Sequence, residues 1–301
     1  MVDVLALGTW AIGGTQWGPS DDDESIRTIR AALDAGMTFI DTADTYGEGR
    51  SESVVGRAIA GRRDGLFIAT KVGVLGNDEV GWKIDISRKH ILEGCEASLK
   101  RLGTDVIDLY QLHWPVKDTP LEESIGALNT LREQGKIRYA GVSNFNAAQL
   151  EEAAKHGPLV SLQSELSMLT AGVLEENVPT ASRLGMGFLG YGPLARGLLT
   201  GKFHGEEPEF PEGDVRRNDK RFHGEGWTKS QRVLDALRPI AEKHGKTLGQ
   251  VATNWVLCQP GVTAALVGAR HPGQVEENLG GQGWKLDEGD LAAIAAATGQ
   301  G

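Results

Sequence analysis

Eight short apolar segments, each of strand length and each followed by a stretch with helical spacing, run along this chain of 301 residues. Regular alternation of this kind is typical of a parallel β-sheet, in which a helix returns the chain to the start of the next strand. Eight such units over this length predict an α/β fold made of one domain, a (β/α)8 or TIM barrel that spans residues 1–301. The expected strands are Val4–Leu7, Met37–Asp41, Leu66–Thr70, Val106–Leu112, Ile137–Val142, Val160–Gln163, Gly187–Tyr191 and Thr263–Val267.

Two parts of the chain do not fit a minimal barrel. The segment Gly201–Lys229, after the seventh expected strand, is too long and irregular for an ordinary connection, so it predicts a functional loop. An amphipathic stretch from Asp287 predicts an extra helix at the C-terminal end. The helix after the third strand is expected from about Ser87, and the helix after the long loop from about Ser230.

Composition limits the classes of function. Hydrophobic residues make up 40% of the chain, and the formal net charge of −10 argues against nucleic acid or an anionic membrane as a partner. The sequence has no apolar run of about 18 residues and starts without a basic segment and cleavage site, so we expect a soluble, cytoplasmic protein. Cys95 and Cys258 lie far apart in helical patterns and are expected to be small buried hydrophobic residues.

Four polar side chains follow the ends of three consecutive expected strands. Asp41 ends the second strand and Tyr46 lies in the loop after it, while Lys71 follows the third strand and His113 the fourth. The carboxyl ends of barrel strands all open at one face, where ligands bind. The sequence therefore predicts a carboxylate, a phenol, an ammonium and an imidazole around one mouth.

This combination suits proton donation to a carbonyl oxygen while a hydride arrives at the carbonyl carbon. A free tyrosine has a pKa of about 10, too high for an efficient acid at neutral pH unless the phenolate is stabilised. Lys71 can stabilise it, and Asp41 can hold Lys71 in place and charged. His113 can orient the carbonyl group.

Several motifs, in order, resemble those of the aldo-keto reductases: FIDTADTYGEGRSE, the strand ending ATK, QLHWP, GVSNF and YGPLARGLLTGK. The resemblance implies a (β/α)8 barrel, a nicotinamide cofactor and reduction of aldehydes or ketones to alcohols. By position, Tyr46 would be the proton donor, Asp41 and Lys71 its tuning pair, and His113 the orienting residue. Family members usually carry a hairpin before the first strand, and Met1 lies so close to that strand that we expect the hairpin to be missing.

The resemblance also implies a set of cofactor-binding residues. Ser143, Asn144 and Gln163 would hold the nicotinamide carboxamide, and Tyr191 would stack on the nicotinamide ring. The glycines after Tyr191 would let backbone N–H groups approach the pyrophosphate. The expected set is Thr9, Trp10, Asp41, Ser143, Asn144, Gln163, Tyr191, Gly192, Pro193, Leu194, Ala195, Gly197, Leu199, Lys202, Arg221, Gly268, Arg270, Gln274, Glu277 and Asn278.

Two arginines are expected to contact the cofactor, and one of them indicates which dinucleotide binds. The turn Gly268–Asn278 matches the place where the family binds the adenosine 2′-phosphate, and a guanidinium is suited to grip a phosphate. Arg270 therefore favours NADP(H) over NADH. In the long loop, Arg221 is expected to reach the cofactor, whereas its basic neighbours, including Arg216, are expected to be surface residues.

Four aromatic residues are expected in loops at or near the mouth: Trp17, Trp82, Trp114 and Phe145. Aromatic walls with one polar end suit a small carbonyl substrate with an apolar or aromatic part.

Three other functions stay open. The barrel could be a cofactor-binding, redox-sensing or regulatory subunit with little turnover, as the aldo-keto-like β subunits of potassium channels are. Lys71 could form a Schiff base as in barrel aldolases, although Asp41 beside it would keep it protonated and unreactive. Asp41, Asp44, Glu48 and His113 could bind a metal ion, although we expect none.

Overall fold

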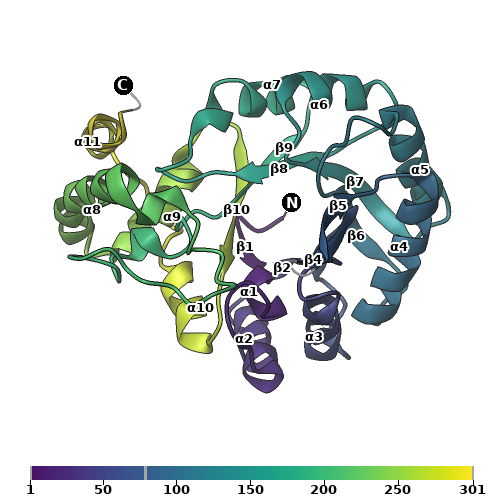
Figure 1. Cartoon of the computed structure of the whole chain (residues 1–301), viewed down its shortest axis with the longest axis horizontal. Coiled ribbons are helices and arrows are strands. Elements are labelled where there is room, and N and C mark those ends of the chain that lie inside the picture. The colour runs from purple at the N-terminus through teal and green to yellow at the C-terminus, as the bar shows by residue number, and fades with distance from the viewer. Residues whose placement is uncertain (1, 78–79, 300–301) are drawn as a thin grey trace.

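Eight parallel strands close into the predicted barrel in the computed structural model, which describes residues 2–77 and 80–299. The strands follow one another around the barrel in the order β1, β2, β3, β6, β7, β8, β9 and β10, and β10 pairs with β1. Figure 1 shows the helices arranged around the outside of this barrel. The strands are β1 (Leu5–Gly8), β2 (Phe39–Asp41), β3 (Phe67–Val72), β6 (Ile107–Leu112), β7 (Ile137–Ser143), β8 (Ser161–Glu165), β9 (Gly187–Tyr191) and β10 (Val262–Gly268).

Local sequence signals set the ends of the helices. Asp21 caps α2 by accepting a hydrogen bond from the backbone of Glu24, and Asn146 forms a capping box with Gln149 at the start of α6. Left-handed glycines end α4 and α8. The helices are α1 (Trp10–Gly13), α2 (Asp22–Asp34), α3 (Arg50–Ile59), α4 (Arg88–Leu102), α5 (Leu121–Glu133), α6 (Ala147–Ala154), α7 (Asn177–Arg183), α8 (Gly224–His244), α9 (Leu248–Cys258), α10 (Pro272–Leu279) and α11 (Glu288–Thr298).

Apolar side chains fill the barrel interior beneath the carboxyl ends of the strands. Phe39, Leu109 and Leu266 belong to one buried cluster there, and the ring of Phe67 packs edge-on against Phe39 with centroids 4.9 Å apart. A larger core lies between the strands and the surrounding helices. Because this interior is packed, the barrel is not an open pore. The polar side chains at the carboxyl ends of the strands therefore face an opening that is closed below by apolar side chains.

A short antiparallel hairpin, β4 (Val74–Asn77) and β5 (Gly81–Ile84), stands between β3 and α4 and was not predicted. Its strands are short, rich in glycine and lack a buried face, so they carry no alternating apolar pattern to reveal them. Of the described residues, only 2–4 precede β1, and they form no strand. None of the helices in the described ranges is long and apolar enough to cross a membrane.

The helices before β9 and after the long loop begin at different kinds of sequence signal. A 3₁₀ turn, Gly172–Leu174, precedes α7, which begins at Asn177 so that Pro179 falls within its first turn. Helix α8 begins at Gly224, before the expected Ser230. The predicted extra C-terminal helix is present as α11.

The predicted long loop is confirmed between β9 and α8, and it is anchored along its length. Phe203, Phe210 and Phe222 pack edge-to-face, with ring centroids 5.0 to 5.6 Å apart. The backbone N–H of Val215 donates to the carbonyl oxygen of Gln16 at 3.0 Å, which ties the loop to the segment after β1. The loop therefore reaches back to the mouth of the barrel.

Candidate active site

A buried ion pair lies at the centre of the mouth. The Lys71 ammonium donates to Asp41 Oδ1 at 2.6 Å, to the backbone oxygen of Thr42 at 2.9 Å and to the Tyr46 hydroxyl at 3.4 Å. Lys71 is 1% exposed and Asp41 3%. Each N–H of the ammonium thus has a partner, and the three expected side chains are brought together.

Close backbone packing holds the loop that carries Tyr46. A side chain at Gly13 would come within 2.7 Å of the Tyr46 carbonyl carbon, and one at Gly47 within 2.3 Å of the Gly13 oxygen. Gly47 also has a φ of 61°, in the left-handed region that glycine tolerates best. These glycines let α1 and the loop after β2 approach closely enough to fix the tyrosine.

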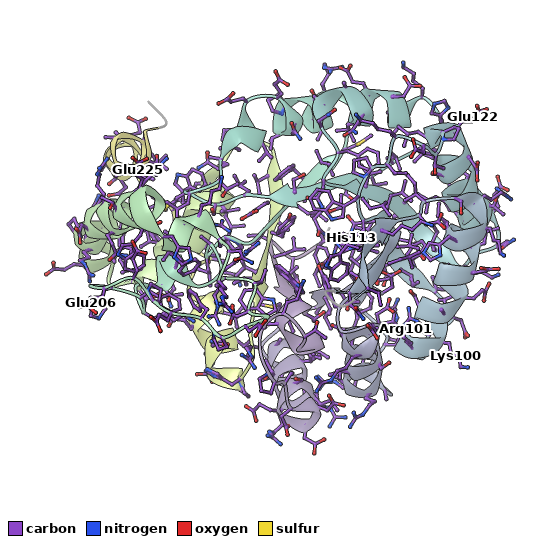
Figure 2. The ribbon with its side chains drawn as sticks, in the orientation of Figure 1. Lys100, Arg101, His113, Glu122, Glu206 and Glu225 are labelled. Carbon is purple, nitrogen blue, oxygen red and sulfur yellow. The ribbon has the colours of Figure 1, made fainter. Side chains whose placement is uncertain are left out.

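His113 completes the group of four side chains. Its ring is 8% exposed and stands edge-on to the Tyr46 ring, with centroids 6.0 Å apart. Figure 2 shows it near the middle of the barrel, far from the peripheral Lys100 and Glu122. Burial, together with the Lys71 charge, holds the pKa of His113 well below its usual range. The imidazole is therefore neutral at neutral pH and can donate one N–H to a ligand.

The acidity of Tyr46 differs from the expectation. Burial raises the pKa of Tyr46 well above its usual value, and the Asp41 and Asp44 carboxylates raise it further. The sequence argument expected Lys71 to lower this pKa, but the ammonium charge is already paired with Asp41. In this structure the phenol is a neutral donor that keeps its proton throughout the neutral range.

Polar groups at the ends of β7, β8 and β9 extend this network. Gln163 donates through Nε2 to Asp41 Oδ2 at 2.9 Å, and the Tyr191 hydroxyl donates to Asn144 Oδ1 at 3.0 Å. Asn144 in turn donates to the backbone oxygen of His113 and to Ser143 Oγ, both at 3.1 Å. The four residues expected at the nicotinamide therefore line the same mouth as the ion pair.

The glycine-rich segment after β9 has an unusual backbone. Ala195 and Arg196 have φ values of 47° and 57°, although left-handed conformations are uncommon for residues other than glycine. Such strain concentrates at functional sites. The ammonium of Lys202 lies 3.1 Å from where a side chain at Gly197 would begin, so a positive charge rests on this segment. Backbone N–H groups in a left-handed turn, with an ammonium group beside them, can bind an anionic ligand.

The positive charges of two arginines, Arg216 and Arg270, act on Lys202. Burial lowers the pKa of Lys202, and the charges of Arg216 and Arg270 lower it further, with Asp214 offsetting them only in part. Arg216 was expected at the surface, but its side chain is only 16% exposed and its guanidinium stacks over Phe210 at 4.6 Å. Such stacking depends on tertiary packing that sequence spacing does not reveal.

The turn that leads from β10 into α10 is braced by its own side chains. Arg270 donates through Nη1 to the backbone oxygen of Trp17 at 3.0 Å, and its backbone N–H donates to Gln274 Oε1 at 2.7 Å. Asn278 donates to the backbone oxygen of Gly268 at 3.1 Å. Glu277 accepts a hydrogen bond from the Thr247 hydroxyl. The side chain of Arg270 thus links this turn to the segment after β1.

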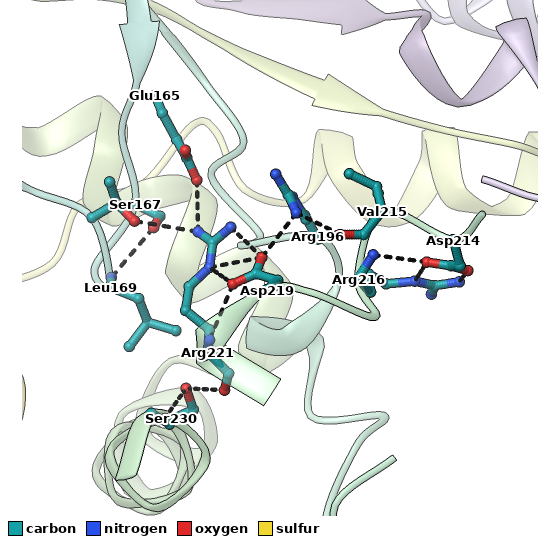
Figure 3. Close-up of polar contacts among 12 residues, drawn as sticks. Glu165, Ser167, Leu169, Arg196, Asp214, Val215, Arg216, Asp219, Arg221 and Ser230 are labelled. Carbon is teal, nitrogen blue, oxygen red and sulfur yellow. Dashed lines mark hydrogen bonds and ion pairs between the residues drawn. The ribbon is translucent and has the colours of Figure 1, made fainter. Parts of the chain in front are cut away.

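Arg221 is held by acidic side chains at the end of β8 and in the long loop. Its guanidinium pairs with Glu165 and with Asp219, both at 2.6 Å, and Asp219 also pairs with Arg196 at 3.2 Å (Figure 3). Arg221 therefore faces two carboxylates in this structure. Glu165 was missed, although it lies two residues beyond Gln163 and so shares that residue's face of β8.

Three of the four expected pocket aromatics are at the rim. Trp17 packs edge-on against Trp10 with centroids 5.2 Å apart, and Trp10 stacks over Tyr46 at 6.2 Å. Trp82 and Trp114 are 48% and 42% exposed. Phe145, by contrast, is completely buried in the main core and does not line the mouth, because its side chain packs inside the layer of helices.

Cysteines and possible metal ligands lie outside this site among the described residues. Cys95 is fully buried as predicted, and burial raises the pKa of its thiol to about 12. Cys258 is half-buried and donates to Asn254. Over the described ranges, no group of three or more His, Cys, Asp or Glu side chains is arranged to hold a metal ion.

Comparisons with known proteins agree with this architecture. The family model described as "Aldo/keto reductase family" matches residues 4–298. The aldo-keto reductase YhdN of Bacillus subtilis is 42% identical over 298 residues, which cover 96% of this chain and 88% of YhdN. The NADH-specific methylglyoxal reductase of Escherichia coli is 34% identical over 305 residues, covering 96% of this chain and 93% of that enzyme.

Among solved structures, a glycerol dehydrogenase from Gluconobacter oxydans superimposes with a TM-score of 0.91 at 41% identity, covering 99% of this chain and 92% of the other. The barrel, the paired Lys71 and Asp41 at its mouth and a family match over nearly the whole length agree with one another. The chain therefore belongs to the aldo/keto reductase family of oxidoreductases.

Proposed function

We propose that this protein reduces aldehydes or ketones to alcohols with NADPH. The observation that carries the proposal is the contact between the Lys71 ammonium and the Tyr46 hydroxyl, 3.4 Å apart, with Asp41 paired to the same ammonium. In the proposed reaction the Tyr46 hydroxyl gives its proton to the carbonyl oxygen. Lys71 stabilises the negative charge that develops on the phenol oxygen, and the neutral His113 imidazole orients the carbonyl by hydrogen bonding.

The residues around the mouth fit a phosphorylated nicotinamide cofactor, which supplies the hydride when bound. Ser143, Asn144 and Gln163 offer hydroxyl and amide groups for the carboxamide, and the Tyr191 ring offers a stacking surface. Lys202 and Arg270 offer positive charge beside the left-handed segment that follows Gly192, which suits phosphate groups. The crowding of cations there, in a protein of net charge −10, supports an anionic ligand.

The preference for NADPH over NADH rests on Arg270, because an exposed guanidinium beside the expected adenosine turn can grip a 2′-phosphate. The Escherichia coli relative, by contrast, is named as NADH-specific. A regulatory role with little turnover is not favoured, since the relatives described above carry the names of reductases and a dehydrogenase.

Loss of NADPH absorbance with a panel of carbonyl compounds tests the proposal. The panel should contain aromatic and aliphatic aldehydes, ketones and sugars, with methylglyoxal, glyceraldehyde and dihydroxyacetone suggested by the named relatives. We expect many turnovers with at least one compound, faster with NADPH than with NADH. A single slow turnover with tightly retained cofactor, whatever the substrate, would instead favour the regulatory role.

A further inference from the structure

The first turn of α3 places two polar side chains behind the mouth of the barrel. Ser51 and Glu52 are both completely buried. The Thr42 hydroxyl donates to Ser51 Oγ at 3.0 Å, and the Ser51 hydroxyl donates to Thr9 Oγ1 at 2.8 Å. Thr42 also supplies the backbone oxygen that accepts from the Lys71 ammonium at 2.9 Å. Ser51 therefore ties the residue after β2 to the residue after β1.

Glu52 makes the corresponding contact with β3. Its Oε1 accepts a hydrogen bond from the Thr70 hydroxyl at 2.6 Å. Thr70 directly precedes Lys71, and successive residues of a strand point to opposite faces of the sheet. Thr70 therefore faces α3, while Lys71 faces the barrel interior. The hydrogen bond to Glu52 fixes the backbone from which the Lys71 ammonium extends.

Arg101, in the last turn of α4, fixes Glu52 in turn. Its Nε donates to Glu52 Oε2 at 2.6 Å, and the two side chains are 28% and 0% exposed. A carboxylate buried in this way depends on its cationic partner. Arg101 also lies against Gly49, because a side chain at Gly49 would begin 2.5 Å from Arg101 Cδ. Gly49 precedes α3 at the end of the loop that carries Tyr46, so Arg101 contacts that loop as well.

We propose that Glu52, Thr70 and Arg101 form a brace that positions the Lys71 ammonium beside the Tyr46 hydroxyl. This inference rests on the proposed reductase function, in which none of the three brace residues touches the reacting atoms. The ammonium and the hydroxyl are 3.4 Å apart, at the long end of hydrogen-bonding distance, so a small movement of β3 separates them. Ser51 holds the ends of β1 and β2 by other contacts, so loss of the brace should displace β3 and its lysine.

The most direct test replaces Thr70, because this leaves every charge in the protein unchanged. Thr70→Val keeps the shape of the side chain and removes the hydroxyl that binds Glu52, whereas Thr70→Ser keeps the hydroxyl. The measurement is the single-turnover rate of NADPH oxidation at saturating carbonyl substrate. We expect this rate to fall by about 10- to 100-fold in Thr70→Val, as for a displaced reacting group, and to stay within about threefold of wild type in Thr70→Ser.

The same two variants should bind their ligands as wild type does. Since the brace touches neither ligand in the proposed mechanism, KM and the NADPH dissociation constant should change by less than about twofold. A wild-type rate in Thr70→Val, an equal fall in both variants, or a loss confined to KM would overturn the proposal.

A second pair of variants separates positioning from charge. Arg101→Gln and Lys100→Gln each remove one positive charge from α4, and Lys100 is exposed and lies farther out than Arg101 in Figure 2. At a temperature where circular dichroism shows both variants folded, Arg101→Gln should slow the single turnover and Lys100→Gln should match wild type. A wild-type rate in Arg101→Gln, or the same fall in Lys100→Gln, would contradict the proposal. If Arg101→Gln does not fold, Thr70→Val decides, because it keeps the ion pair.

The solvent isotope effect on this single turnover distinguishes positioning from a loss of stability. A displaced lysine slows proton donation by Tyr46, so the ratio of the rates in light and heavy water should be larger in Thr70→Val than in wild type. A variant that is only less stable keeps the wild-type ratio in its folded fraction, and that result would also overturn the proposal.

Crystal structures of wild type and the two Thr70 variants give a readout that needs no turnover. The distance from Lys71 Nζ to the Tyr46 hydroxyl should exceed 3.4 Å in Thr70→Val and stay near it in wild type and Thr70→Ser. The same distance in all three proteins would contradict the proposal. If wild type reduces no carbonyl compound but the distance depends on the Thr70 hydroxyl, the proposed reductase function fails while the brace stands.

Discussion

Lys71 Nζ and Asp41 Oδ1 lie 2.6 Å apart inside the barrel, with their side chains only 1% and 4% exposed. Removing one member of such a pair leaves the other charge buried without a partner, which typically costs about 3 to 5 kcal/mol. Lys71→Met should therefore lower the free energy of unfolding at neutral pH by about that amount. Urea unfolding of the variant and wild type measures the difference.

The loss of stability in Lys71→Met should depend on pH, and the direction of this dependence is a control for the explanation. In Lys71→Met the buried Asp41 carboxyl loses the charge that opposes its raised pKa. When the pKa of an acid is higher in the folded state than in the unfolded state, the folded state binds its proton more tightly. This proton binding stabilises the fold fully at a pH below the pKa of the unfolded state, and the stabilisation is lost as the pH rises through the pKa of the folded state. The deficit should therefore shrink on acidification, and adding Asp41→Asn should recover part of it. A deficit independent of pH would contradict the explanation.

Arg270 should discriminate between the two dinucleotides. Its guanidinium is exposed and held by backbone oxygens of the segment after β1, so it is oriented without an acidic partner in the described ranges. Replacing Arg270 by Ala should weaken NADPH binding by about 1 to 3 kcal/mol, as for one charge-assisted phosphate contact, and leave NADH nearly unchanged. Fluorescence titration of both dinucleotides measures this, with Arg217→Ala in the long loop as the matched control. Equal weakening of NADPH and NADH would remove the basis for the preference.

Trp114 follows His113 directly and is 42% exposed at the rim. If its ring covers the apolar part of a bound substrate, Trp114→Ala should raise KM for an aromatic aldehyde by an amount worth about 1 to 2 kcal/mol of lost apolar burial. A small aldehyde should be affected much less. Tyr139, 47% exposed near the amino end of β7, is a matched aromatic control at the opposite end of the barrel. The same change for both aldehydes would exclude Trp114 from the pocket.

The barrel and its central residues were predictable because they depend on local signals. Each strand is a short apolar run, and a strand that ends in Asp41 or continues into His113 directs that side chain to the same face as its neighbours. The meeting of Asp41, Tyr46 and Lys71 follows from strand order alone, since β2 and β3 are adjacent.

The missed features depend on which distant segments pack together. Arg216 stacks on Phe210 and Arg221 pairs with Glu165 only because the long loop folds back over the mouth. Phe145 looked like a pocket wall but is covered by the helical layer. The Asp44 carboxyl acquires its raised pKa from burial and from Glu52, which the sequence places eight residues away without indicating that the two would meet.

Single-turnover reduction by Tyr46→Phe tests the central claim most directly. The substitution removes only the hydroxyl beside Lys71, so the bound dinucleotide should keep nearly its wild-type dissociation constant. Loss of the positioned acid should slow the decay of NADPH absorbance by a factor of about 10² to 10⁴. Decay at the wild-type rate would contradict the assignment of Tyr46 as the proton donor.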